Sequence, residues 1–391
     1  MGQLRGNDIL IDPGNQPVRH RGEASRAAWL PCLLLAAVYG MICASSDRVW
    51  AQSPELAMRD FSSGQIKKGA RSIGFGGDGA TWGNYGLVWK DADSGLVDYS
   101  DTHFTNGNDF QFYAVGVNTP RLWHDLVLYA IVMEQETNNV KFNAKSPGLG
   151  SAAVPVVGTG ADQALFIKAA MPLGNGFSAG VLLSREVSHF DASAVADANQ
   201  RVHYETIWRP SGGFGVVWQP DNKWLLGFRA LYNNDFEKRT DSVSVAEGMA
   251  TSQEYRLGAS YSPWKGGLID VGATRLEKFT AIAGTHSVTY NPNLGFEQTV
   301  IDNRLILRFG LDETSPTAGL TYRFTQFKLD IAYVYNMAHA RVGDLFGTQS
   351  NSIFAALTID YGPGSSAPAR PSMRSSFLHS SDFVSAGAGP P

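Results

Sequence analysis

The sequence predicts an all-β protein: a transmembrane antiparallel meander β-barrel of about 14 strands, preceded by an N-terminal Gly-rich plug segment. Three observations support this, namely period-two alternation, an even number of alternating runs, and the order of short and long connections. From Phe327 to Met337 every second residue is large and apolar, while Lys328 and Asp330 lie on the other face. A soluble sandwich or barrel also alternates and is the alternative, but the strand length of about ten residues and the ionisable second face favour a membrane barrel.

The composition limits the classes of protein that remain. The chain has 391 residues, of which 43% are hydrophobic and 17% charged, with a formal net charge of -4. A nucleic-acid partner is not expected, because such a surface needs a basic excess. The sequence holds no catalytic motif and no metal-ligand spacing. We therefore expect a protein that is not an enzyme and that uses no cofactor.

Residues 1–51 are predicted to form an N-terminal extension and a signal peptide. An apolar run over residues 27–44 follows three arginines and ends in Val49-Trp50-Ala51, a small-residue cleavage site. An uncleaved membrane anchor is the alternative. Both cysteines, Cys32 and Cys43, lie in this leader. The exported part would then contain none, as suits a barrel held by its own strand pairing rather than by disulfides.

Residues 52–94 are predicted to form a periplasmic or plug segment. Gly74, Gly76 and Gly79 match the G-x-G-x-x-G spacing of a dinucleotide-binding loop. That motif requires a buried strand before it and a helix after it, and the charged residues at 67, 68 and 71 and the glycines at 83 and 86 fit neither. We interpret the segment as one whose glycines allow backbone to approach other backbone closely.

The same segment resembles a known signature. Gly69-Ala70-Arg71 followed by Gly74-Phe75-Gly76-Gly77 is similar to the N-terminal signature of outer-membrane barrels of the long-chain fatty-acid transporter (FadL-like) superfamily, which includes PorV-like barrels. Residues 305–310, 317–320 and 329–333 resemble the closing hairpins of those barrels. The Asn-Pro pair that continues the signature is missing, since residues 89–93 read Trp-Lys-Asp-Ala-Asp. The resemblance implies a plug inside the barrel, with these candidates for the plug or gate: Gly69, Ala70, Arg71, Gly74, Gly76 and Gly77.

Residues 95–361 are predicted to form the barrel. The alternating runs fall at 95–104, 108–117, 121–135, 161–172, 176–188, 201–218, 223–233, 251–262, 267–279, 292–300, 303–311, 316–325, 326–337 and 351–361. Short turns alternate with long polar connections over 137–160, 188–200, 234–250, 281–291 and 338–350, although 105–107 and 312–315 are short where long loops are expected. This order is typical of a meander barrel with periplasmic turns and extracellular loops.

Two features of the predicted strands need comment. Pro210-Ser211-Gly212-Gly213 interrupts the run 201–218, which indicates a bend or bulge in one long strand or a division into two strands. Aromatic pairs stand beside three short turns, as interfacial anchors do in membrane barrels: Trp218 with Trp224, Tyr261 with Trp264, and Tyr322 with Phe324.

Ionisable residues on the second face are expected to line the lumen, because on the lipid face each would cost about 2 to 4 kcal/mol at the midplane. The candidates are Arg304, Arg308, Lys328 and Asp330. They form either a selective path or a salt-bridged filling. Residues 362–391, rich in Pro, Ser, Ala and Gly, are predicted to be a disordered tail.

By resemblance we expect passive transport of a hydrophobic or small organic compound across a Gram-negative outer membrane. The alternative is a non-transporting, PorV-like barrel that anchors or shuttles secreted protein partners, and an outer-membrane hydrolase is a third possibility. Expected partners are outer-membrane lipid, the barrel-assembly machinery and a hydrophobic small molecule. The substrate, the oligomeric state and the true start stay open at this point.

Overall fold

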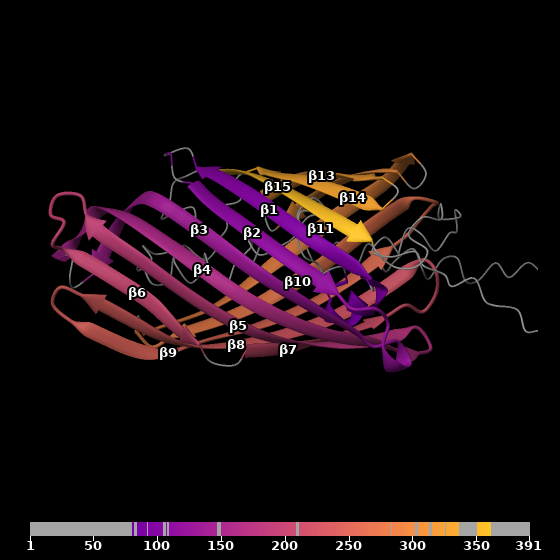
Figure 1. Cartoon of the computed structure of the whole chain (residues 1–391), viewed down its shortest axis with the longest axis horizontal. Helices are drawn as coiled ribbons and strands as arrows, with labels where there is room; N and C mark the ends of the chain where they lie inside the picture. Colours follow the sequence, from indigo (N-terminus) through magenta and orange to yellow (C-terminus); the bar gives the residue numbers. More distant parts are fainter. Residues whose placement is uncertain are drawn as a thin grey trace, which may run out of the picture.

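A computed structural model shows a barrel built from long antiparallel strands (Figure 1). It describes residues 80–360 except 82–83, 92, 105–106, 108, 147–149, 209–210, 283, 302–303, 313–314, 325 and 336–349. Two short 3-10 helices, η2 (Tyr85–Asp91) and η3 (Trp123–Asp125), accompany the strands. The strands are β1 (Ser94–Phe104), β2 (Asp109–Asn118), β3 (Val127–Ser146), β4 (Gly150–Gly174), β5 (Phe177–Ala194), β6 (Arg201–Trp208), β7 (Ser211–Trp218), β8 (Trp224–Asp241), β9 (Val245–Tyr261), β10 (Gly267–Thr280), β11 (Thr285–Ile301), β12 (Leu305–Asp312), β13 (Ser315–Arg323), β14 (Phe327–Tyr335) and β15 (Ser350–Asp360).

The sheet is closed, with the predicted meander order. Apart from β6 and β7, which are not paired with each other, consecutive strands pair antiparallel, and β1 pairs with β15 from Ser94 opposite Asp360 to Phe104 opposite Ser350. The strands β6 and β7 share one place in the wall, because each pairs with β5 on one side and β8 on the other. The 15 strands therefore fill 14 positions, which confirms the predicted fold class.

The run 201–218 thus fills one strand position of the barrel with two shorter strands, β6 and β7. One strand ends at Trp208 and the next begins at Ser211, with the two halves stacked end to end between the same neighbours. The sequence left open a bend or a division, and the strand assignment shows a division that preserves the order of the barrel.

Four of the predicted long loops are wrong in extent, because strands occupy much of each range and leave a shorter connection. Strands β3 and β4 continue through residues 137–160 and meet at Ser146 and Gly150, and β8 and β9 continue to Asp241 and Val245. The hairpins β5–β6 and β10–β11 are extended in the same way, and Figure 1 shows such hairpins projecting at the left. Polar residues there suggested loops, but strands standing in water have no need of an apolar face. The fifth predicted loop, 338–350, lies almost entirely outside the described residues.

The outer face of the barrel carries a continuous apolar belt. Outward positions that remain exposed include Val115, Val132, Ile167, Leu183, Phe214, Leu257, Phe309 and Ile353, which come from eight different strands. Ring pairs lie at the short-turn end of the belt: Phe177 with Trp218 (centroids 5.5 Å apart), Trp224 with Tyr261 (4.5 Å) and Tyr322 with Phe324 (4.8 Å). An apolar belt edged by aromatic rings is the surface that a bilayer and its interface require.

The inner face carries the ionisable groups. Along β14 the inward residues Asp330, Ala332 and Val334 are buried, while Ile331 and Tyr333 point outward and are exposed. The same alternation runs along β2 and β5. A closed sheet with apolar atoms outside and ions inside is the inverse of a soluble barrel, so its solvent on the outside is lipid. No helix in the described ranges is both long and apolar enough to cross a membrane.

Several predictions lie outside the described residues. These are the leader 1–51, residues 52–79 of the plug segment with its candidates Gly69, Ala70, Arg71, Gly74, Gly76 and Gly77, and the tail 362–391. The described part of the plug segment begins at Ala80.

The lipid-facing belt can be tested at Leu257, which is 67% exposed on β9. Replacing it with lysine should lower the free energy of unfolding in bilayers by about 2 to 4 kcal/mol, because the charge enters the apolar belt. The matched change is Gln253→Lys. Gln253 lies on the same face of β9, four residues before Leu257 and on the far side of Tyr255 from the apolar belt, so a charge there should have a much smaller effect. Urea titrations of protein refolded into vesicles measure both, and equal losses would argue against the placement of the belt.

Candidate functional site

The inner wall of the barrel divides into an apolar half and a polar half. Buried apolar residues gather on β2 to β6 and on β14 and β15. Buried ionisable side chains are most numerous on β8 to β14, although the rest of the wall also buries Asp98, Asp162 and several serines. This division follows from the inward residues of each strand, because a closed sheet assigns every second residue to the interior. The interior therefore contains one region rich in apolar side chains and one rich in ionisable side chains.

The apolar half is centred on aromatic rings. Phe110 and Phe112 of β2 and Phe354 of β15 are each no more than 1% exposed. Ser100 of β1 stands opposite Phe112 on one side and Phe354 on the other, so the two rings flank β1 on the inner face. The cluster continues along the wall through Ala114, Val127, Tyr129, Ile131, Phe190, Val202, Tyr204, Ala332 and Val334.

Two aromatic rings in this half lie directly over glycines of neighbouring strands. A Cβ on Gly116 would meet the Tyr129 hydroxyl oxygen at 2.5 Å, and one on Gly158 would meet Cζ of Phe190 at 2.2 Å. The rings fold down against the sheet because no side chain stands beneath them. The apolar wall is consequently flatter than its residue sizes suggest.

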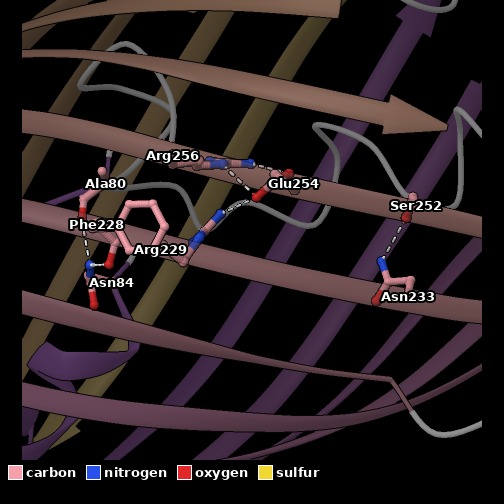
Figure 2. A network of polar contacts seen from close by, with 8 residues as sticks. All are labelled: Ala80, Asn84, Phe228, Arg229, Asn233, Ser252, Glu254 and Arg256. Atoms are coloured by element: carbon pink, nitrogen blue, oxygen red, sulfur yellow. Dashed lines mark hydrogen bonds and ion pairs between the residues drawn. The ribbon is translucent and has the colours of Figure 1, made fainter. Parts of the chain in front are cut away.

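The polar half contains a buried triad around Glu254. Arg229 Nη2 donates to Glu254 Oε1 at 2.9 Å, and Arg256 Nε approaches the same oxygen at 2.7 Å. Figure 2 shows both guanidinium groups directed at this one carboxylate, from β8 and from its own strand β9. All three residues are 8% exposed or less. Their mutual pairing compensates for part of the cost of burying charge.

A second buried cluster contains three of the four lumen candidates. Arg308 donates to Glu297 Oε2 at 2.7 Å and to Asp330 Oδ1 at 3.3 Å, and Thr321 also bonds to both Arg308 and Asp330. Lys328 lies 3.7 Å from the other oxygen of Asp330. The structure thus brings Arg308, Lys328 and Asp330 together on the inner wall in a dense salt-bridged arrangement.

The fourth candidate, Arg304, is placed differently. It precedes β12, in the turn after Ile301, and its side chain is exposed. The alternation of the sequence put it on the same face as Arg308, but the strand begins only at Leu305. Beyond the end of a strand, period-two alternation no longer assigns a side chain to the interior.

The described part of the predicted plug segment, residues 80–91 without 82 and 83, lies on the inner wall and is named the ledge here. It includes η2, which packs against β4, β5 and β7. The wall beneath it is glycine: a Cβ on Gly180 would meet the Tyr85 carbonyl oxygen at 2.3 Å, and one on Gly227 would meet the Ala80 carbonyl oxygen at 2.2 Å. Backbone therefore rests on backbone, which only glycine permits.

Polar contacts fix the ledge at several points. The Asn84 amide donates to the carbonyl oxygens of Ala80 and Phe228, both at 2.8 Å, as Figure 2 shows. Thr81 donates to Asp270 Oδ1 at 2.6 Å, and Ser260 donates to Thr81 at 2.8 Å. These contacts join the ledge to β8, β9 and β10.

Tyr85 is the aromatic centre of the ledge. Two cations lie near its ring, with Lys168 Nζ 5.7 Å and Arg229 Cζ 5.3 Å from the ring centroid. Both distances are in the range of cation–π attraction. Because Lys168 belongs to β4 and Arg229 to β8, Tyr85 connects the two halves of the inner wall.

Sequence reasoning did not identify the wall glycines or the anchoring residues Thr81 and Asn84. The glycines Gly180, Gly213, Gly215 and Gly227 are scattered over three strands, and only strand register brings them together. The available signal was weak: glycine is unfavourable within a strand, so several at inward positions indicate a close approach of backbone. Among the described residues no group of three His, Cys, Asp or Glu side chains is placed to hold a metal ion.

The buried triad yields a stability prediction. Glu254→Gln should lower the free energy of unfolding by about 3 to 5 kcal/mol, because two buried guanidinium groups lose their anion. The matched control is Glu277→Gln, since Glu277 pairs with Arg275 at 2.7 Å on the outer face, where the pair is screened. Urea titration in vesicles should show a much smaller loss for the control. Equal losses would show that the triad contributes no more than a surface pair.

The glycine wall yields a second prediction. Gly180→Ala and Gly227→Ala should displace the ledge, because each added methyl group meets ledge backbone. The matched control is Gly95→Ala on β1, where the nearest atom would lie 3.8 Å away. The readout is thiol labelling of Leu87→Cys on the ledge, where Leu87 is buried. Labelling should be fast with either wall substitution and slow with the control, and slow labelling in all three would contradict the seating of the ledge.

Comparison with known proteins gives structural matches only. No family model matches the chain, and no curated protein sequence matches it. Among solved structures the chain is similar to the toluene transporter TbuX of Ralstonia pickettii (12% identity, TM-score 0.49, 75% of this chain and 98% of that one). It is also similar to the toluene transporter TodX of Pseudomonas putida (9%, 0.46, 74% and 96%) and to a Pseudomonas aeruginosa FadL homologue (12%, 0.48, 75% and 96%). At these identities and scores the likeness says nothing about what this chain carries.

Proposed function

We propose that the protein is an outer-membrane barrel for the passive uptake of a small apolar organic compound. The observation that carries this proposal is the apolar half of the inner wall, where Phe110, Phe112 and Phe354 face the interior of a barrel whose outer surface is itself apolar. Transport down a gradient requires a path of suitable chemistry and no reacting group, so the proposal is of a non-catalytic protein.

The physical argument concerns partition. An apolar solute gains about 25 cal/mol for each Å² of its surface that leaves water, so an apolar wall inside the barrel lowers its free energy along the path. An ion gains nothing from such a wall, and a path for ions would instead be lined by backbone carbonyl groups or charged side chains. The buried salt bridges of β8 to β14 fit the role of a rigid backing opposite that wall.

The location follows as part of the proposal. The signal-like leader, the apolar belt and the aromatic pairs favour the outer membrane of a Gram-negative cell, with lipid and the barrel-assembly machinery as partners. Heat-modifiable mobility in gels of the outer-membrane fraction would test this location. Recovery of the protein in the soluble periplasm would contradict it.

Uptake itself is tested by filling the interior. Ala114→Trp adds a large side chain at an inward position that is buried in the cluster, whereas Ala130→Trp adds the same side chain on the outer face. In Gram-negative cells producing each variant, initial uptake of radiolabelled ethylbenzene should fall to the level of cells without the protein for Ala114→Trp. It should stay near that of the unchanged protein for Ala130→Trp. Equal rates for cells with and without the unchanged protein would overturn the proposal.

A second candidate function, anchoring of secreted protein partners, is favoured by the firm seating of the ledge. A barrel whose interior holds a fixed segment can serve as a scaffold without a path. A disulfide between Thr81→Cys and Ser260→Cys, whose hydroxyl oxygens are 2.8 Å apart, would hold the ledge in place. Uptake that continues under oxidising conditions would favour transport past a fixed ledge. Absence of uptake in both redox states would favour the scaffold.

A further inference from the structure

Two buried polar side chains in the apolar half, Gln135 and Ser100, lack a hydrogen-bond partner within the described residues. Gln135 on β3 is 1% exposed, and within the described part of the chain neither its amide nitrogen nor its amide oxygen has a hydrogen-bond partner. The hydroxyl of Ser100 on β1 is in the same condition, with the residue 0% exposed. Both side chains belong to the inward set of their strands.

Strand register places these two groups on either side of one aromatic ring. Ser100 stands opposite Phe112, and Phe112 stands opposite Gln135, on the adjacent strands β1, β2 and β3. Neighbouring strands lie about 4.8 Å apart, so the two polar groups are about 10 Å apart with the Phe112 ring between them. A small aromatic molecule lying against Phe112 would have a hydrogen-bonding group at either edge.

The energetics argue against a purely structural role for Gln135. A buried amide without partners costs about 1 to 3 kcal/mol, and an apolar side chain of similar size would avoid this cost. The surrounding cluster, with Phe112 and Ala114 on β2 and Met133 on β3, would accept leucine at this position. The amide costs stability in the protein alone, and a bound molecule that pairs with it would recover that cost.

The charges near the site define the class of ligand. Asp162 stands opposite Gln135 on β4, and Asp98 precedes Ser100 by two residues on the same face; both are buried. Two carboxyl groups at the edges of the site disfavour an anionic ligand. The Gln135 amide can both donate and accept a hydrogen bond, as an alcohol, a phenol or a ketone requires.

We propose that Gln135 and Ser100 form a recognition site on the inner wall for an uncharged apolar molecule that carries one hydrogen-bonding group, such as an aromatic alcohol. The inference rests on the proposed uptake function and deepens it, because it names the polar feature that the preferred solute shares. Phe112 supplies the apolar surface, and Gln135 or Ser100 supplies the hydrogen bond.

The test compares four ligands with one carbon skeleton: ethylbenzene, 2-phenylethanol, phenylacetate and 2-phenylethylamine. Binding to the folded, full-length protein is measured by calorimetry, and 2-phenylethanol should bind most tightly of the four. Gln135→Leu should weaken 2-phenylethanol binding about tenfold, the usual worth of a hydrogen bond to a buried group, and leave ethylbenzene binding unchanged. The matched control is Gln163→Leu, because Gln163 lies exposed on the outer face, where it bonds to Glu134.

Each other outcome contradicts the inference. Tighter binding of phenylacetate would show an anion site, and tighter binding of 2-phenylethylamine would show a cation site at the aspartates. Equal effects of Gln135→Leu on the alcohol and the hydrocarbon, or no effect on either, would leave Gln135 a structural residue. If Gln135→Leu fails to fold, Ser100→Ala is measured in its place, and unchanged alcohol binding there would also contradict the site.

Failure of this site and failure of the uptake function are distinguishable. Uptake of ethylbenzene by cells reports the function without involving the hydrogen bond. Calorimetry reports the site without requiring a complete path through the membrane. Uptake with no preference for the alcohol would remove the site alone, whereas alcohol binding without uptake would remove the transport function alone.

Discussion

Everything in this structure depends on the closure of the sheet between β1 and β15. Inside a bilayer an unpaired backbone group costs several kcal/mol, so a row of unpaired groups along a strand edge is not tolerated. The pairing of Ser94 with Asp360 through Phe104 with Ser350 removes the last such edge. The division at β6 and β7 is acceptable for the same reason, because both halves still pair with β5 and β8.

Closure then determines where each kind of side chain can lie. Once the sheet is a cylinder, every second residue faces lipid and the others face a confined interior. Charged side chains are strongly destabilising on the lipid-facing side. Inside the barrel they can form ion pairs, as Glu254 does with Arg229 and Arg256. Inside, however, large side chains from many strands compete for space, and glycines such as Gly180 and Gly227 leave room on the wall for a ledge.

The fold was predictable from the sequence as far as it follows from the period-two alternation of the strands and from their even number. The alternation from Phe327 onward, the number of runs and the order of the short turns were enough to predict a barrel with 14 positions in its wall, and the structure has it. The limits of the strands were less predictable. Beyond the lipid belt polar residues occur on both faces, so β3 and β4 look like loops in sequence although they remain paired to Ser146 and Gly150.

The interior was less predictable because it depends on register. Nothing in sequence relates Ser100 to Gln135, since strand register sets both of them opposite Phe112, or Gly180 to Tyr85, since that approach depends on how η2 packs on the wall. Arg308 and Asp330 could be assigned to a face, but their ion pair depends on two successive strand pairings, β12 with β13 and β13 with β14. The period-two alternation predicts which side chains point into the barrel, and the strand register determines which other side chains they contact there.

The same distinction explains why a polar group in an apolar wall is informative. At a lipid-facing position the amide of a glutamine would lower the stability of the protein. In a soluble core, replacing an amide without partners by an apolar residue would raise the stability. Gln135 faces neither lipid nor bulk water, and the side chains opposite it are Phe112 and Asp162. A side chain that lowers the stability of the protein in its empty state is best explained by what the interior contains when it is occupied.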